Sequence, residues 1–213
     1  MQPLQLGCFI EVCFLCGRYV IMTDTISRIH MLGAPGAGVT TLGRSLAECL
    51  NIRHFDTDDF HWFTEDALPY RRRRNPEHRR KLLTESLDAQ DSWVLSGSLC
   101  GWGDVFVPRF QVIVYCWLPV ETRLMRIRER ELARYGPDRL ASGGDLHAVF
   151  EKFCTWASDY DKDSGNIRSR AHELEWLQNL PCPVLRLEEE MPLEESVAII
   201  VAFLAINDTS LHK

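Results

Sequence analysis

Gly33-Ala34-Pro35-Gly36-Ala37-Gly38-Val39-Thr40-Thr41 decides the fold that we predict for this chain. The stretch differs at one position from the phosphate-binding P-loop pattern, which is Gly, four residues, Gly, Lys, and then Ser or Thr. Gly33, Gly38 and Thr40 fit the pattern, and Val39 stands in the place of the lysine. The stretch therefore predicts a nucleotide-phosphate site, and the missing lysine raises the question of whether that site supports chemistry.

The backbone of such a loop binds anions without help from a lysine. Its N–H groups form a nest for phosphate oxygens, and the N-terminal end of the following helix adds partial positive charge. The Thr40 hydroxyl would serve a magnesium ion, and the Thr41 hydroxyl a neighbouring phosphate. The residues that we predict to bind the nucleotide are Gly33, Pro35, Gly36, Ala37, Gly38, Val39, Thr40 and Thr41.

Two other interpretations of the loop are weaker. A glycine-rich turn that binds nothing would not explain the Thr-Thr pair. A dinucleotide-binding turn needs the order G-x-G-x-x-G, whereas glycines 33, 36 and 38 give G-x-x-G-x-G. A dehydrogenase is therefore unexpected.

The segments around the loop predict an α/β domain. An apolar run at residues 28–32 precedes the loop, and helical spacing of apolar residues follows it at 40–50. Further strands are expected at 52–56, 93–95, 111–118 and 183–187, and further helices at 76–90, 121–135, 146–161, 169–180 and 193–205. This alternation predicts one three-layer domain over residues 22–213, in which helices cover both faces of a five-stranded parallel sheet. Residues 120–180 hold no expected strand and would form a helical lid, with a loop at 136–144.

Composition limits the function further. The chain has 213 residues, with 24 basic and 30 acidic side chains and a net charge of −6, so no overall basic field indicates nucleic acid. Its 8 cysteines are mostly isolated in apolar surroundings, which is typical of thiols in a reducing cytoplasm.

The first residues of the chain form a separate segment. Cys8, Cys13 and Cys16 match part of an iron–sulfur spacing, although residues 1–21 are expected to form a poorly ordered extension. Glu11 interrupts that extension, which fits neither a signal peptide nor a membrane span. We expect a cytoplasmic protein.

Two carboxylates follow the second expected strand. Asp56 and Asp58 would lie at the carboxyl end of the sheet, where open α/β sheets bind ligands. Such a pair could hold hydrated magnesium and accept a proton from a substrate hydroxyl. The alternative is a polar loop in which Asp58 or Asp59 caps a following turn.

The loop and Phe55-Asp56-Thr57-Asp58 together resemble the adenylate kinase and shikimate kinase branch of P-loop kinases. The resemblance implies a nucleoside monophosphate kinase-like fold, ATP with Mg²⁺, and a small-molecule acceptor. It also implies that Asp56, with Thr40, serves the metal and that Asp58 serves the acceptor hydroxyl. Ser96-Gly97-Ser98 is similar to the small-residue substrate turn of that group. The chain looks most similar to uncharacterised bacterial adenylate kinase-like proteins that carry Val in place of the P-loop lysine.

Arginines form the third group of candidates. Arg123, Arg126, Arg130 and Arg134 are three, four and four residues apart and share one helix face. The resemblance implies that lid arginines fold over the phosphates, so we predict Arg126 and Arg130 as catalytic beside Asp58. The alternative is a solvated face paired with Glu129 and Glu131. The run at 71–74, with Arg79 and Arg80, is either a solvated surface or a site for an anionic acceptor, and RNA is a weaker alternative.

The sequence thus predicts a nucleoside triphosphate-binding protein that transfers phosphate from ATP to a small acceptor, for which an anionic molecule is one of the alternatives. The alternative is a catalytically impaired nucleotide-binding sensor or regulatory protein, and its basis is Val39 alone. Neither membranes nor nucleic acids are expected partners.

Overall fold

A computed structural model of the chain describes residues 11–13, 18–20, 26–63, 65, 70, 72–162 and 168–208, the first two ranges as backbone only. Those two ranges are strands β1 (Glu11–Cys13) and β2 (Arg18–Val20), which pair antiparallel. The rest of the predicted extension at 1–21 lies outside the described residues, as do the side chains of Cys8, Cys13 and Cys16.

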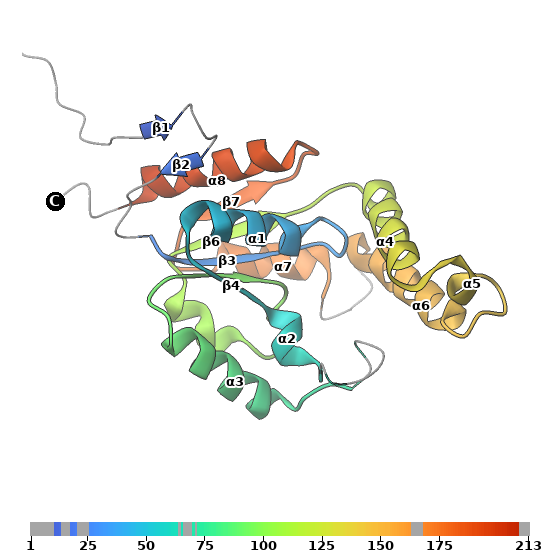
Figure 1. Ribbon diagram of the computed structural model, residues 1–213. Helices are drawn as coiled ribbons and strands as arrows, with labels where there is room; N and C mark the ends of the chain where they lie inside the picture. The colour runs from blue at the N-terminus through green and yellow to red at the C-terminus, as the bar shows by residue number, and fades with distance from the viewer. Residues whose placement is uncertain are drawn as a thin grey trace, which may run out of the picture.

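The central element is a parallel sheet of five strands in the order β4-β5-β3-β6-β7 (Figure 1). Its strands are β3 (Arg28–Gly33), β4 (Arg53–Asp56), β5 (Trp93–Ser96), β6 (Val112–Cys116) and β7 (Val184–Leu187). All neighbouring pairs are parallel. Every residue of β6 is buried, because helices cover both faces of a parallel sheet. The predicted five-stranded parallel sheet is confirmed.

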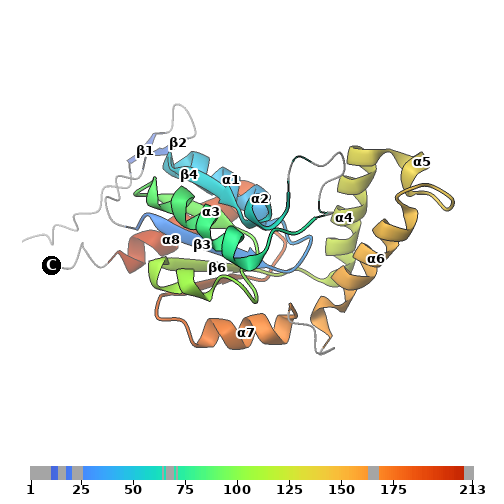
Figure 2. The same ribbon diagram turned by 90° about the horizontal axis from the view of Figure 1, so that it is seen from below.

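Helices cover the sheet on both sides (Figures 1 and 2). On one face, α1 (Val39–Leu50) and α8 (Leu193–Asn207) share a hydrophobic cluster with β3, in which Leu46 and Ile200 are fully buried. On the other face, α3 (Pro76–Asp88) and α7 (Arg170–Gln178) contribute Leu83 and Leu177 to a second cluster with β6. These three layers place the carboxyl ends of β3, β4 and β5 at one edge.

A group of helices projects from that edge (Figure 2). It contains α4 (Val120–Tyr135), α5 (Pro137–Leu140), α6 (His147–Ser158) and the 3-10 turn η2 (Asp159–Asp161). Ile127 of α4 packs against Cys154 and Ala157 of α6 in a small cluster separate from the sheet. Because α7 packs on the sheet, the projection is shorter than the range 120–180 that we expected, and α5 lies where we expected a loop.

Two further short elements complete the described part of the chain. Helix α2 (Thr57–His61) follows β4, and the 3-10 helix η1 (Asp104–Arg109) precedes β6. Both are too short for apolar periodicity to indicate them from the sequence. None of the helices that the structure describes is both long and apolar enough to cross a bilayer.

Candidate nucleotide- and acceptor-binding site

The glycine-rich loop connects β3 to α1 at the carboxyl edge of the sheet. Gly36 and Gly38 have φ angles of 85° and 89°, a left-handed region that favours glycine. A Cβ atom on Gly36 would also lie 2.6 Å from the backbone oxygen of Arg123. The loop backbone therefore depends on glycine at both positions, and its left-handed residues are those from which anion-binding nests are built.

Helix α1 begins at Val39, directly after this loop. Its N-cap is Gly38, which provides no side-chain cap, and no acidic residue stands in its first turn. The Val39 side chain is partly buried and packs against the cluster shared by α1 and α8. The first N–H groups of α1 thus have neither a capping side chain nor a nearby carboxylate of this helix, which suits an anion.

Thr40 and Asp56 form a direct contact between α1 and the end of β4. The Thr40 hydroxyl donates a hydrogen bond of 2.8 Å to Asp56 Oδ2, and Asp56 Oδ1 accepts from the Asp58 N–H at 3.0 Å. A hydroxyl and a carboxylate in contact are hard oxygen ligands, and Mg²⁺ is commonly held by one or two such groups together with phosphate oxygens and water. The two predicted metal residues therefore lie together and fit Mg²⁺.

Asp58 lies two residues further along the chain, in α2. The capping role in α2 falls to Asp56, rather than to Asp58 or Asp59 as the alternative interpretation had it. Asp58 lies at the exposed surface of α2, and its carboxyl group is only in part solvated. Burial is the main cause that raises its pKa, the charge of Asp56 raises it further, and Arg168 lowers it. A carboxylate with a raised pKa is a better proton acceptor than an ordinary aspartate.

Arg123, the first arginine of the predicted stripe, is fully buried. Its guanidinium donates to the carbonyl oxygens of Leu118 at 2.8 Å, Pro35 at 3.2 Å and Ala157 at 3.0 Å, and it pairs with Asp161. Pro35 belongs to the glycine-rich loop, whereas Ala157 and Asp161 belong to the helical projection. Arg123 therefore joins the loop to the projection, and it is not part of a solvated face.

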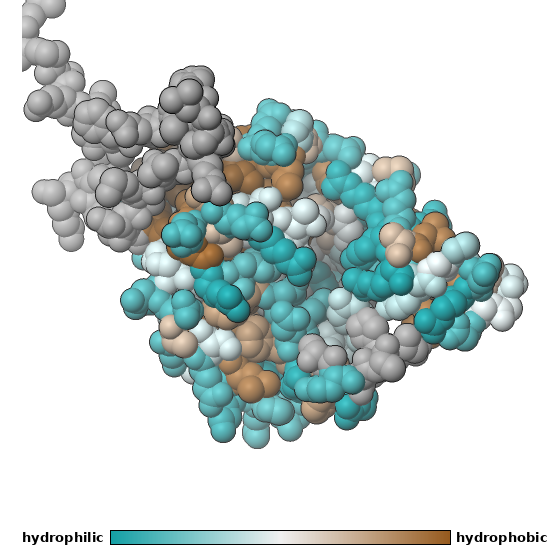
Figure 3. Space-filling view, in the orientation of Figure 1, coloured by the Kyte–Doolittle hydropathy of each residue, from teal (hydrophilic) through white to brown (hydrophobic). Residues whose placement is uncertain are grey.

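Arg126, like Arg123, lies beside the loop, but it is partly exposed. Its Nη1 atom is 3.7 Å from the position that a Cβ atom on Gly38 would take, and its Nη2 atom pairs with Glu190 at 2.7 Å. Arg130 and Arg134 instead pair with Glu131, at 2.8 and 3.7 Å. Arg130 and Arg134 therefore show the ion pairing with a glutamate of the same helix that we gave as the alternative to a role over the phosphates. Hydrophilic residues predominate on the part of the surface around α4 (Figure 3).

Arg168 was missed in the sequence. It donates to the Gly33 carbonyl at 3.1 Å, pairs with Glu173 at 3.5 Å, and its guanidinium carbon lies 5.4 Å from the centre of the Trp156 ring. Its charge also acts on Asp58. Arg168 stands between two expected helices, so no periodic pattern or motif marks it in the sequence.

The arginine run at 71–74 is only in part a solvated surface. Arg74 is buried and donates to the carbonyl oxygens of Asp59 at 2.8 Å and of Trp62. Arg79, also buried, donates to the Arg74 carbonyl at 2.6 Å. These two side chains hold the segment after α2 in place, while Arg72 and Arg73 are exposed and Arg71 lies outside the described residues.

The Ser96-Gly97-Ser98 turn follows β5 and packs closely on its neighbours. The Ser96 hydroxyl and His54 Nε2 are 3.0 Å apart. A Cβ atom on Gly43 of α1 would lie 2.0 Å from Ser96 Oγ, and one on Gly97 would lie 2.0 Å from Thr57 Oγ1. Glycine at both positions lets α1, the turn and α2 meet at one edge.

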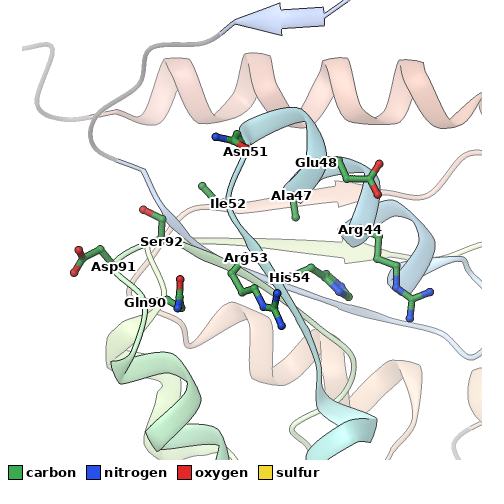
Figure 4. Close-up of a pocket in the computed structure, with 10 residues that line it drawn as sticks. All are labelled: Arg44, Ala47, Glu48, Asn51, Ile52, Arg53, His54, Gln90, Asp91 and Ser92. Atoms are coloured by element: carbon green, nitrogen blue, oxygen red, sulfur yellow. The ribbon is translucent and has the colours of Figure 1, made fainter.

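One pocket lies away from the glycine-rich loop. It has a volume of about 640 Å³, and its walls come from α1, the start of β4 and the residues before β5 (Figure 4). Asn51 and Asp91, for example, stand at the amino ends of β4 and β5. Ligands of open α/β sheets bind at the carboxyl ends of the strands, so we place the functional site at the loop.

Known proteins are similar to this chain in sequence and in fold. No protein-family model matches it. The uncharacterized protein YqaC of Bacillus subtilis (strain 168) is 40% identical over 179 residues, which are 84% of this chain and 98% of YqaC. A shikimate kinase of Acinetobacter baylyi is 31% identical over 115 residues, which are 48% of this chain and 62% of that kinase.

Two crystal structures share the architecture. Shikimate kinase from Bacteroides thetaiotaomicron superposes with a TM-score of 0.51 at 21% identity, covering 84% of this chain and 98% of that one. A gluconokinase from Sinorhizobium meliloti 1021 gives a TM-score of 0.50 at 16% identity, covering 89% and 98%. These likenesses concern the fold, and they confirm the predicted three-layer P-loop architecture. From its identity to YqaC over nearly all of that protein, we conclude that this chain belongs to the YqaC family.

Proposed function

We propose that the protein is a phosphotransferase that moves a phosphoryl group from ATP to the hydroxyl of a small molecule. One observation carries the proposal: the Thr40 hydroxyl contacts Asp56 at 2.8 Å, directly between a capless helix N-terminus and Asp58. Phosphate-binding backbone, two oxygen ligands for a cation and a carboxylate for the acceptor hydroxyl thus lie at one sheet edge. The matching shikimate kinase and the gluconokinase of the same fold are named for phosphoryl transfer to small molecules, which supports it.

The roles of the residues follow from their chemistry. The backbone of the loop and of the first turn of α1 would bind the phosphates, and Thr40 with Asp56 would hold Mg²⁺. The ion, when bound, neutralises phosphate charge. Asp58 would orient the acceptor hydroxyl and take its proton on a carboxylate oxygen. Arg168, beside Asp58 and Gly33, would add positive charge at the acceptor side.

In this proposal, Arg126 replaces the charge that Val39 does not provide. Its guanidinium lies against Gly38, and its ion pair with Glu190 joins two partly exposed side chains. Exposed ion pairs contribute at most about 1 kcal/mol, so a phosphate can displace Glu190 at little cost. Arg130, which pairs with Glu131, could join only if that pair opens.

Arg126→Gln is expected to lower the rate of phosphoryl transfer about 10- to 100-fold, the effect of one charge-assisted contact. Arg128→Gln is the matched control, because Arg128 is exposed on the same helix. The measurement is kcat with the best acceptor found. If both variants transferred phosphate as fast as the wild type, Arg126 would not be the residue that supplies the charge missing at Val39.

The proposed activity is tested with Mg²⁺-ATP, a broad panel of metabolites and detection of phosphorylated products by mass spectrometry. A product is expected with the wild type. Thr40→Val keeps the shape of the side chain but removes the hydroxyl, and it should lower turnover about 10-fold or more. Tight nucleotide binding without any phosphorylated product would contradict the proposal.

That contradictory result would favour a second function, a nucleotide-binding sensor without catalysis. The observation behind it is Val39, whose side chain packs into the core and carries no charge. Under this hypothesis, the wild type and Asp58→Asn would bind nucleotide equally well, and neither would form a phosphorylated product.

A further inference from the structure

A second, smaller cavity lies beside the Ser96-Gly97-Ser98 turn. Its volume is about 170 Å³, and it is bordered by β3, by the residues after the turn and by α7. Leu32 and Trp176 give it apolar walls, and His30 and Glu173 line it with polar side chains. None of these four residues has a role in the phosphate site described above.

His30 presents a hydrogen-bond acceptor in this cavity. The ring is fully buried, and its Nδ1 atom is 3.0 Å from the Leu95 carbonyl oxygen, so Nδ1 must carry the proton and donate it. Burial lowers the pKa of His30 to about 4, which keeps the ring neutral at physiological pH. Nε2 therefore has a free lone pair, and it has no hydrogen-bond partner among the described residues.

Glu173 presents a second acceptor. Its side chain is only 3% exposed, and its Oε2 atom accepts a hydrogen bond of 2.6 Å from the Tyr160 hydroxyl. Its Oε1 atom is buried and has no hydrogen bond within the described part of the chain. Arg168 Nε, 3.5 Å away, balances part of the charge without forming a hydrogen bond.

Two buried acceptors without a hydrogen bond from the described residues call for a further partner, because buried polar groups are almost always bonded to protein, ligand or ordered water. The missing partner must bring N–H or O–H groups, and Glu173 repels an anion. An ammonium group brings three donors and no acceptor, and its attached carbons suit the walls formed by Leu32 and Trp176. A hydroxyl group brings a single donor and leaves one acceptor without a partner, and a water molecule brings two donors but no carbon atoms to contact Leu32 and Trp176.

The geometry points to a binding site for a primary amine: we propose that the phosphoryl acceptor carries an amino group that donates to Glu173 Oε1 and His30 Nε2. This inference rests on the proposed phosphotransfer. Arg168 connects the two places, since it pairs with Glu173 and donates to the carbonyl of Gly33 at the start of the glycine-rich loop. The cavity is also lined by Ser98, the last residue of the candidate substrate turn. An acceptor anchored by its amine at the cavity would extend its hydroxyl toward the loop.

The test compares linear amino alcohols of two to five carbons with diols of the same lengths. Binding is measured by calorimetry in the absence of nucleotide, and phosphorylation is measured separately with Mg²⁺-ATP. We expect each amino alcohol to bind about 10- to 100-fold more tightly than its diol, as charged hydrogen bonds to buried partners imply. The ¹⁵Nε2 resonance of His30, assigned with a His30→Phe variant, should shift when the amine binds.

Glu173→Gln is the informative variant. The Tyr160 hydroxyl also lies 2.9 Å from the Tyr115 hydroxyl. With Tyr115 as the donor in that contact, Tyr160 donates to the oxygen of glutamine, and the amide nitrogen takes the place of Oε1 as a donor in the cavity. The preference for amines over diols should disappear while the fold, followed by circular dichroism, is kept. Glu175→Gln, on the exposed side of the same helix, is the control and should keep the preference.

The outcomes separate this inference from the proposed function. Amino alcohols that bind with the expected preference would support the amine site, and phosphotransfer would be overturned if neither they nor any member of the metabolite panel were phosphorylated. Phosphorylation of acceptors without an amine preference, unaffected by Glu173→Gln, would overturn the amine site and leave phosphotransfer standing. A His30 resonance that no amine shifts, as water held in the cavity would give, also overturns the amine site.

Discussion

Asp58→Asn is expected to lower the rate of phosphoryl transfer about 10²- to 10⁴-fold, the usual contribution of a positioned general base. Asparagine keeps the size of the side chain but cannot take the proton of the acceptor hydroxyl. The affinity for Mg²⁺-nucleotide should change little, since Thr40 and Asp56 remain in contact. Steady-state kinetics and nucleotide titration measure the two quantities separately.

The same variant should not lose stability. Burial raises the pKa of Asp58 in the folded protein, so folding disfavours its ionised form. The contribution of Asp58 to stability therefore falls as the pH rises from the pKa of the unfolded chain to that of the folded protein, and at neutral pH the charge is a burden. Asp58→Asn removes this burden, and its melting temperature at pH 7 should equal or exceed that of the wild type.

Asp59→Asn is the matched control, because burial also raises the pKa of Asp59 in the same helix turn. It should show a similar effect on stability and keep phosphoryl transfer. If both variants retained full activity, Asp58 would not be the base. If Asp58→Asn were inactive because it unfolds, the sign of the pKa argument would be wrong.

Arg123→Leu is expected to lower the free energy of unfolding by about 3 kcal/mol, the lower end of the range for breaking a buried ion pair. The buried guanidinium donates to carbonyl oxygens of the glycine-rich loop and of α6, and it pairs with Asp161. Leucine leaves these acceptors without donors. The lower end applies because Asp161 keeps 25% of its side chain exposed, so water can partly replace the arginine. Urea unfolding monitored by tryptophan fluorescence measures the loss.

Arg128→Leu makes the same chemical change on the exposed side of α4 and should cost less than about 0.5 kcal/mol. The Arg123 variant should also weaken nucleotide binding, because the Pro35 carbonyl loses its anchor. Equal stability of the two variants would show that the contacts of Arg123 contribute nothing net to folding.

The sequence predicted the sheet and the loop well for physical reasons. A loop of glycines between an apolar run and a helical pattern is local information, and the fully buried strands β5 and β6 read as continuous apolar runs. The position of Asp56 could also be predicted from the sequence, because it follows an expected strand and the carboxyl ends of parallel strands meet at one edge. Its contact with Thr40 follows from that topology.

The arginines show where sequence reasoning ends. Arg123 and Arg126 share a helix face, yet one is fully buried and the other stands at the surface beside Gly38. The difference comes from Ala157 and Asp161, which lie more than 30 positions away along the chain. Arg168 and Arg74 likewise find their partners through tertiary packing, and helical periodicity carries no information about it.

The close approach of Gly43 to Ser96 links the sizes of two residues on different elements. A Cβ atom at position 43 would lie 2.0 Å from Ser96 Oγ, 3.1 Å from His54 Nε2 and 3.3 Å from Ser96 Cβ. An alanine there therefore requires the Ser96 hydroxyl to turn away or to be lost, and with it the contact between Ser96 and His54. Substitutions in the helix that follows the glycine-rich loop and at the end of β5 are therefore expected to accompany one another during divergence of the family.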